Sequence, residues 1–218
     1  MNQVWLPLRS HLFSFMLTIA ITGGIACGKS TVSKMLTAAC PAGAGASFDC
    51  DAAVAEIYED PHVVERVAML EPDMDLNVNG DLNRKLLRQR AFESSEFREK
   101  LEAILHPLVL KQAREFADSV SDGVKILFVE VPLLYEADFP LEREVELVVA
   151  SSQESQINRL SSSRNIEREL ALQIIKSQMP LEEKMKRADI VIWNDGSNKA
   201  AESQVRHLIE RCNPLFAV

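Results

Sequence analysis

The segment from 17 to 31, LTIAITGGIACGKST, constrains the fold of this chain more than any other stretch. It matches G-x-x-x-x-G-K-[ST], the pattern of a loop that binds nucleotide phosphates, with Gly23, Gly28, Lys29 and Ser30 at the fixed positions. Apolar, β-branched residues before the loop predict a buried strand, and apolar residues at helical spacing after it predict a helix. Because such a loop requires this order of strand, loop and helix, the sequence predicts a nucleoside triphosphate site rather than a glycine-rich turn that binds nothing.

The residue types of the loop indicate its chemistry. Glycines let the backbone turn its N–H groups around an anion, and the following helix adds the positive end of its dipole. Lys29 is expected to reach the β- and γ-phosphates of ATP, and the Ser30 hydroxyl to bind Mg²⁺. Cys27 lies near this electropositive end, so its thiol is either reactive or an inert replacement for serine. The residues predicted to bind ATP are Gly23, Gly24, Ile25, Ala26, Cys27, Gly28, Lys29, Ser30 and Thr31.

Composition restricts the partners and the compartment. A chain of 218 residues can form one domain with insertions. Its formal net charge of −8 argues against a broad nucleic-acid-binding surface, which needs clustered Lys and Arg. The four cysteines form no C-x-x-C pair and predict reduced thiols in a cytoplasmic protein. We expect a small-molecule substrate and no membrane partner, and the oligomeric state is left open.

The N-terminal region allows two interpretations. Arg9 and the apolar stretch 12–22 superficially resemble a signal peptide that ends at a lipid-modified Cys27. Cleavage before Cys27 would destroy the phosphate loop, which is the more specific motif. Residues 1–15 are therefore expected to be an extension, or the product of an upstream start codon with Met16 as the true start.

Apolar runs that alternate with helical patterns predict the fold class. Near-continuous apolar strands separated by helices are typical of a parallel sheet covered by helices on both faces. The sequence therefore predicts an α/β fold with a five-stranded parallel sheet. The expected strands lie at 17–22, 46–48, 124–131, 145–150 and 189–194.

Two insertions interrupt this pattern. Residues 52–123 are too many for one crossover helix and predict a helical subdomain. The segment 151–187 is polar and helical in pattern, which indicates either solvated helices or a mobile lid. A break near 161–163 would let Arg159 and Arg164 both point inward. The predicted organisation is a single domain over 16–218, with a core of 16–52, 115–150 and 188–218, an insertion of 53–114 and a lid of 151–187.

The second expected strand ends in two acids, Asp49 and Asp51. Ligands bind at the carboxyl ends of strands in open α/β sheets, so either carboxylate is a candidate to accept a proton from an acceptor hydroxyl or to bind Mg²⁺. Alternation along the strand predicts that the two side chains share a side. For Asp51, catalysis and capping of the following helix stay equal alternatives, and Asp49 is a candidate metal ligand beside Ser30.

Several motifs together resemble the dephospho-CoA kinase family. The loop TGGIACGKST and the acidic DCD at 49–51 are similar to the phosphate loop and the Asp-x-Asp strand end of that family. The segments GDLNRKLL at 80–87, LEAILHPLV at 101–109 and VPLLYE at 131–136 follow in the family's order. The family's lid and C-terminal patterns are matched by Gln156, Arg159, Arg164, Asn165, Gln178, Lys184, Ala188-Asp189 and Asn194-Asp195-Gly196.

The resemblance implies a P-loop kinase with a CoA-binding insertion and a lid. It implies transfer of the γ-phosphoryl group of ATP to the 3′-hydroxyl of the ribose of dephospho-CoA, with Mg²⁺ as the metal. Asp51 is implied to be the general base, and Lys29 to bind the donor phosphates. Arg159 and Arg164 are implied to stabilise charge on the transferring group once the lid closes, a role that suits guanidinium groups.

The same resemblance suggests residues for the acceptor side. His106 precedes a proline, which predicts a departure from helical geometry at the histidine. The family carries this His-Pro pair in its acceptor subdomain, so His106 is expected to bind the acceptor. Arg84 is a candidate contact for an acceptor phosphate, with a surface ion pair as the alternative. Glu136 is a candidate on the acceptor side, and Glu130 is a candidate magnesium-associated acid at a strand end.

Two positions depart from the family pattern. The family usually has Gly-Ile-Gly-Ser-Gly where this loop has Gly-Ile-Ala-Cys-Gly, so Ala26 is expected to fit without positive φ. Ala55 stands where the family often has Arg or His, which puts an acceptor contact from that position in doubt.

Two other functions compete with this interpretation. A nucleoside or nucleoside monophosphate kinase shares the core, the lid and an acceptor insertion, but His106-Pro107 and the run VPLL at 131–134 favour the first family. A P-loop switch or ATPase module usually carries Asp-x-x-Gly after a strand, where this chain has VPLL.

Overall fold

The computed structural model describes residues 16–78, 81–120 and 122–216. They form two compact units. One comprises Asp49–Asp118, and the other comprises the chain up to Phe48 and from Ser119 onward. The N-terminal extension expected at 1–15 lies outside the described residues.

The larger unit is built on a five-stranded sheet in the order β2-β5-β1-β6-β7. β1 pairs in parallel with β5 and β6, and β6 pairs in parallel with β7. The predicted five-stranded parallel sheet flanked by helices is confirmed. All residues of β1 are buried, so the strand before the phosphate loop is the centre of the sheet. The strands are β1 Leu17–Gly23, β2 Gly45–Asp49, β5 Ile126–Glu130, β6 Val145–Ala150 and β7 Ile190–Trp193.

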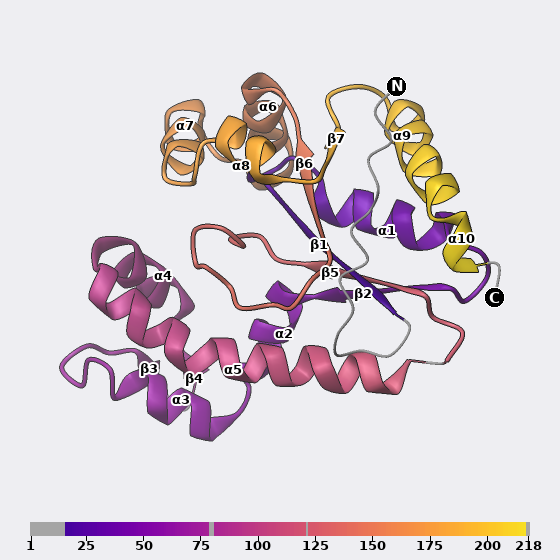
Figure 1. Cartoon of the computed structure of the whole chain (residues 1–218). Helices are drawn as coiled ribbons and strands as arrows, with labels where there is room; N and C mark the ends of the chain where they lie inside the picture. Colours follow the sequence, from indigo (N-terminus) through magenta and orange to yellow (C-terminus); the bar gives the residue numbers. More distant parts are fainter. Residues whose placement is uncertain (1–15, 79–80, 121, 217–218) are drawn as a thin grey trace. The chain divides into compact units, whose positions relative to one another are not determined.

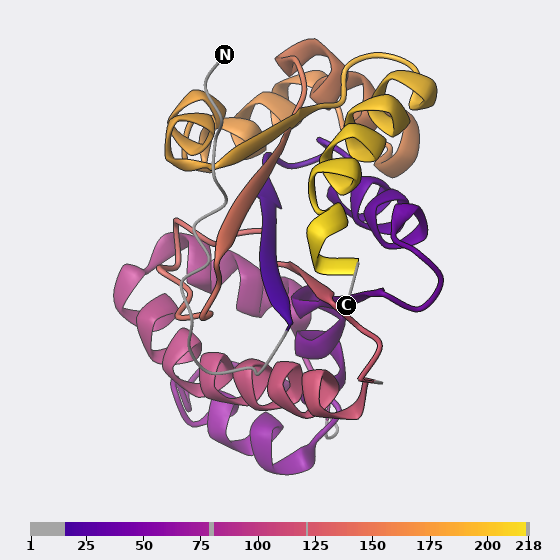
Figure 2. The same cartoon turned by 45° about the vertical axis from the view of Figure 1, so that its right-hand side comes forward.

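One face of this sheet packs against two helices, α1 (Lys29–Ala39) and α9 (Asn198–Arg211), which lie side by side (Figures 1 and 2). Side chains from alternate positions of the strands enter this core, among them Ile19, Ile21 and Phe128, because successive strand residues point to opposite faces. A short helix, α10 (Asn213–Phe216), follows α9. The central strand and α1 therefore hold the phosphate loop between two rigid elements.

The segment expected to be a lid contains three helices, α6 (Gln153–Arg164), α7 (Arg168–Lys176) and α8 (Leu181–Arg187). Ile157, Leu160 and Ala171 form a small apolar cluster between α6 and α7. The break near 161–163 that would let both arginines point inward does not occur, because α6 continues to Arg164 and ends at Asn165 in a left-handed conformation with φ 51°. The serine hydroxyls bond to nearby carbonyls, Ser163 to that of Arg159 for example, without interrupting the helix.

The smaller unit is helical with a two-stranded antiparallel ribbon. Its elements are α2 Cys50–Ile57, α3 Pro61–Ala68, β3 Asn77–Val78, β4 Asp81–Leu82, α4 Arg84–Glu93 and α5 Ser95–Ser119. The predicted departure from helical geometry at His106 is wrong, because α5 passes through Pro107. Pro107 deprives the Ala103 carbonyl of its helical donor, but both residues are exposed, so water can satisfy that oxygen. Of the helices in the described residues, none is long and apolar enough to cross a bilayer.

Candidate active site

The phosphate loop joins β1 to α1 in the order that the motif requires. Gly23 is the last residue of β1 with φ 150°, and Gly28 precedes α1 with φ 91°. A Cβ atom at Gly23 would collide with the carbonyl oxygen of Val149, and one at Gly28 would collide with the side-chain amide of Asn194. Both positions therefore exclude larger residues for steric as well as conformational reasons.

Ala26 adopts a left-handed conformation with φ 56°, so the expectation that it fits without positive φ is wrong. The loop keeps a backbone shape that suits glycine, although alanine stands there. A left-handed conformation costs an alanine about 1–2 kcal/mol, and it persists only where the surroundings determine it.

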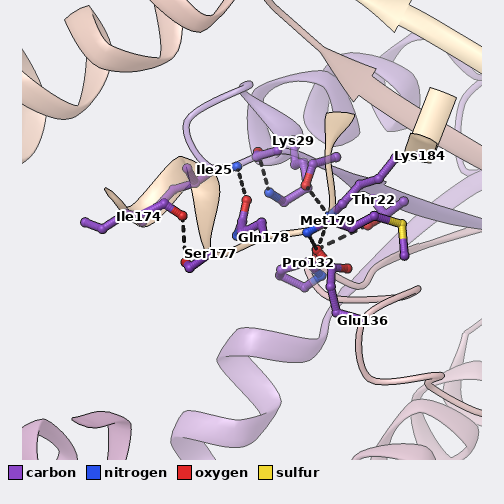
Figure 3. Close-up of polar contacts among 12 residues, drawn as sticks. Thr22, Ile25, Lys29, Pro132, Glu136, Ile174, Ser177, Gln178, Met179 and Lys184 are labelled. Atoms are coloured by element: carbon purple, nitrogen blue, oxygen red, sulfur yellow. Dashed lines mark hydrogen bonds and ion pairs between the residues drawn. The ribbon is translucent and has the colours of Figure 1, made fainter. Parts of the chain in front are cut away.

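Side chains from distant parts of the sequence supply those surroundings. Three of them donate to three consecutive loop carbonyls: Gln156 Nε2 to Ile25 O at 2.8 Å, Arg159 Nη1 to Ala26 O at 3.1 Å, and Asn194 Nδ2 to Cys27 O at 2.8 Å. A fourth, Gln178, accepts a hydrogen bond from the Ile25 N–H at 2.8 Å through its Oε1 atom (Figure 3). A carbonyl held in this way does not point at a phosphate, so the contacts favour a loop that presents N–H groups to an anion.

The two residues that follow Gly28 carry the expected chemistry. Lys29 Nζ lies 3.1 Å from the carbonyl oxygen of Gly24, at the start of its own loop (Figure 3). The Ser30 hydroxyl donates to Glu130 Oε2 at 2.9 Å, and Glu130 is buried at the end of β5. A hydroxyl beside a carboxylate provides the oxygen ligands that Mg²⁺ takes, so Ser30 and Glu130 fit this metal.

The two arginines of α6 lie in different environments. Arg159 is held through both terminal nitrogens, by Ala26 O and by Asn194 O at 2.5 Å. Arg164 is exposed at the last residue of the helix. The resemblance implies the same role for both, but in this structure Arg159 is occupied by backbone carbonyls and Arg164 is accessible.

Lys184 is a fully buried charge, for which the sequence predicts no role beyond the lid pattern. Its Nζ pairs with Glu136 Oε1 at 2.7 Å and donates to the carbonyl oxygen of Gly23 at 3.3 Å (Figure 3). Glu136 Oε1 also accepts the Met179 N–H at 3.1 Å. Glu136, expected on the acceptor side, thus anchors the chain between α7 and α8.

Cys27 is buried completely, and its Sγ atom accepts a hydrogen bond from Ser151 at 3.4 Å. Burial restricts the access of oxidants and alkylating agents, which favours the inert alternative for this thiol.

The two acids of the DCD segment have different structural roles. β2 ends at Asp49 and α2 begins at Cys50, so the prediction that Asp49 and Asp51 share a side of one strand is wrong. Asp49 Oδ1 accepts the N–H groups of Asp51 at 2.8 Å and of Ala52 at 3.2 Å, which makes Asp49 the cap of α2. Asp51 lies exposed in the first helical turn.

Arg84 and His106 also belong to the smaller unit. Arg84 donates to the carbonyl oxygen of Ala55 at 3.3 Å and lies over the Tyr58 ring, 5.7 Å from its centroid. Position 55 therefore contacts Arg84 through its backbone, which alanine supplies as well as any residue. Burial raises the pKa of Tyr58 to about 12, against an opposing effect of the Arg84 charge. Burial lowers the pKa of His106 below its ordinary value, which favours a neutral imidazole.

Sequence comparisons with known proteins agree on one family. The sequence model of the family described as dephospho-CoA kinase matches residues 17–200. A dephospho-CoA kinase of Fusobacterium nucleatum is 38% identical over 196 residues, which cover 89% of this chain and 98% of that protein. The crystal structure of TT1252 from Thermus thermophilus matches with a TM-score of 0.77 and 31% identity, over 91% of this chain and 98% of that one. A dephospho-CoA kinase from Campylobacter jejuni, 24% identical, shares the fold with a TM-score of 0.62, over 90% of this chain and 97% of that one.

Proposed function

This chain belongs to the dephospho-CoA kinase family, and from that premise we propose that it transfers the γ-phosphoryl group of ATP to the 3′-hydroxyl of the ribose of dephospho-CoA. The acceptor oxygen forms a bond to the γ-phosphorus, the bond from that phosphorus to the β–γ bridging oxygen breaks, and ADP and a proton are released. One observation carries the nucleotide half of the proposal: Lys29 and Ser30 open α1 directly after a loop whose carbonyls are held by side chains.

Phosphoryl transfer requires positioning and charge stabilisation more than covalent chemistry from the protein. Lys29 and the loop N–H groups bind the donor phosphates. Ser30 and Glu130 hold Mg²⁺, which neutralises charge on the phosphates when it is bound. Arg164, accessible at the end of α6, stabilises charge on the transferring group.

Residues of the smaller unit bind and activate the acceptor in this proposal. Asp51 takes the proton of the 3′-hydroxyl, because the capping role that competed for its carboxylate belongs to Asp49. Arg84 binds an acceptor phosphate from its place against α2, and His106 binds the acceptor as a neutral group. The cytoplasmic location indicated by the cysteines stays a prediction.

A coupled assay tests the proposal directly. Purified protein with ATP and Mg²⁺ is offered dephospho-CoA, adenosine, AMP and CMP in parallel, and product is identified by mass. We expect coenzyme A to form, with the other acceptors far poorer and with EDTA abolishing turnover. Lys29→Met serves as the control for a contaminating kinase and should lose activity. A preference for AMP or CMP would instead assign the chain to the nucleoside monophosphate kinases.

A further inference from the structure

The backbone of Ile25, Ala26 and Cys27 is shaped by side chains that lie 131 to 167 positions away in the sequence. We propose that Arg159 is a positioning residue, which holds the phosphate loop in its ATP-binding shape through the carbonyl of Ala26. This inference rests on the proposed ATP site, and it replaces the role in charge stabilisation that the resemblance implies for Arg159.

The contacts of Arg159 form a closed ring with the loop. One terminal nitrogen donates to Ala26 O and the other to Asn194 O, while the Asn194 side chain donates to Cys27 O. The guanidinium of Arg159 thus connects Ala26 of the loop to Asn194 after β7, and the Asn194 side chain bonds the next loop carbonyl, that of Cys27. A planar fork makes two such bonds in fixed directions, and a lysine ammonium does not reproduce that geometry.

The ring acts where the loop is strained. Ala26 has φ 56°, a conformation that an alanine leaves readily unless its neighbours hold it. The oxygen bound by Arg159 is the carbonyl of Ala26 itself, so loss of the bond frees the strained residue first. If the free loop then occupies its binding shape only part of the time, the apparent Kd for ATP rises in inverse proportion to that fraction.

A positioning residue and a residue that acts on the reacting groups have different effects on the kinetics. A charge that acts on the transferring phosphoryl group lowers kcat and leaves ground-state binding intact. A positioning residue of the loop weakens ATP binding itself. Moreover, glycine at position 26 removes the cost of the left-handed conformation, so it should restore binding only where the bond from Arg159 is missing.

The experiment is a double-mutant cycle read by calorimetric binding of a non-hydrolysable ATP analogue with Mg²⁺. It compares the unmutated chain with Arg159→Lys, Ala26→Gly and the double variant. We expect Arg159→Lys to raise Kd about tenfold, since a charged donor to a carbonyl is lost, with a smaller change in kcat at saturating ATP. Ala26→Gly alone should change Kd less than about twofold, but in the Arg159→Lys background it should recover about threefold.

Two controls keep the result interpretable. Arg168→Ala removes an exposed arginine of α7 whose partner Glu154 is exposed too, and it should leave Kd unchanged. Hydrogen exchange of the 24–28 amides should accelerate in Arg159→Lys and not in Arg168→Ala. Circular dichroism establishes that each variant is folded, and Arg159→Lys keeps a long, charged side chain at this position.

Two outcomes would overturn the inference. One is an unchanged Kd for Arg159→Lys with a large loss of kcat, which would return Arg159 to the transferring group. The other is an equal effect of Ala26→Gly in both backgrounds, which would show that Arg159 does not act through that residue. A chain that binds the analogue but leaves dephospho-CoA unreacted would contradict the proposed function and leave this inference intact.

Discussion

Two turns in this chain each lead from a strand into a helix, but only one of the two helices is capped by a side chain of its own turn. The phosphate loop leads from β1 into α1, and the Asp49 turn leads from β2 into α2. Among the described residues no side chain caps α1, whose first position follows Gly28, whereas the carboxylate of Asp49 caps α2 by accepting two backbone N–H groups. The first turn of α1 can thus present N–H groups to an anion, and two N–H groups in the first turn of α2 are bonded by Asp49.

The two turns also differ in which residues stabilise them. The Asp49 turn is stabilised by a residue two or three positions from its partners. The phosphate loop has no such local cap. It is stabilised by hydrogen bonds from residues far along the chain, from Gln156 to Asn194. A turn whose N–H groups must bind a ligand is therefore stabilised by side chains from other parts of the chain, which bond to its carbonyl oxygens.

The largest effect expected from this comparison concerns Asp51. Asp49, and not Asp51, caps α2, which favours Asp51 as the general base, so Asp51→Asn should lower kcat by about 10²–10⁴-fold, the usual contribution of such a base. Binding of ATP should change little. The measurement is steady-state kinetics with dephospho-CoA, together with calorimetric titration of nucleotide.

Asp49→Asn is the matched control, since asparagine caps a helix as well as aspartate does. It should keep turnover near that of the unmutated chain. Loss of turnover in Asp49→Asn, with normal turnover in Asp51→Asn, would exchange the roles of the two acids and show that the Asp49 turn is not merely a capped turn.

The second prediction addresses the tertiary support of the loop. Lys184 is fully buried and joins Gly23 to Glu136, so Lys184→Met leaves a carboxylate without its cation. We expect a loss of about 3–5 kcal/mol in the free energy of unfolding, as for other broken buried ion pairs. Urea denaturation followed by circular dichroism measures it.

Lys186→Met provides the control within the same helix. Lys186 pairs with Glu183 at 2.7 Å, but both side chains are more than half exposed, so solvent screens the pair. Its loss should shift the urea midpoint far less than the loss of Lys184. Equal shifts for the two variants would mean that the buried pair does not support the loop.

Features that depend on neighbouring residues were predictable from the sequence, and features that depend on distant residues were not. The strand, the loop and α1 follow from a local motif, and the sheet follows from apolar runs, so both were predictable. The shared side expected for Asp49 and Asp51 was wrong because β2 ends at Asp49 and α2 begins at Cys50, and this boundary, which alternation does not reveal, makes Asp49 the cap. The positive φ of Ala26 was missed because it is imposed by Arg159, whose contact with the loop spans 133 positions and leaves no local pattern.

A smaller effect is expected when the cap itself is removed. Asp49→Ala deletes the acceptor for two N–H groups at the start of α2 and should destabilise the chain by about 1 kcal/mol. Asp49→Ser should recover most of this loss, because serine also caps helices. Denaturation midpoints of the two variants give the difference. A loss in Asp49→Ser as large as that in Asp49→Ala would show that the turn, like the phosphate loop, depends on more than its cap.

The smallest predicted effect is a pH dependence in the unit that carries the Asp49 turn. Burial lowers the pKa of His106 in the folded chain, so on acidification the unfolded chain takes up this proton first. The contribution of the neutral imidazole to stability is therefore complete above the unfolded pKa of about 6.5, and it is lost as the pH falls from there through the lower pKa of the folded chain. From pH 7.5 to 5.5 the urea midpoint of the unmutated chain should fall further than that of His106→Gln, which has no proton to gain. Parallel midpoints over this range would show that His106 does not respond to acid, and that local burial in this unit is too slight to be sensed.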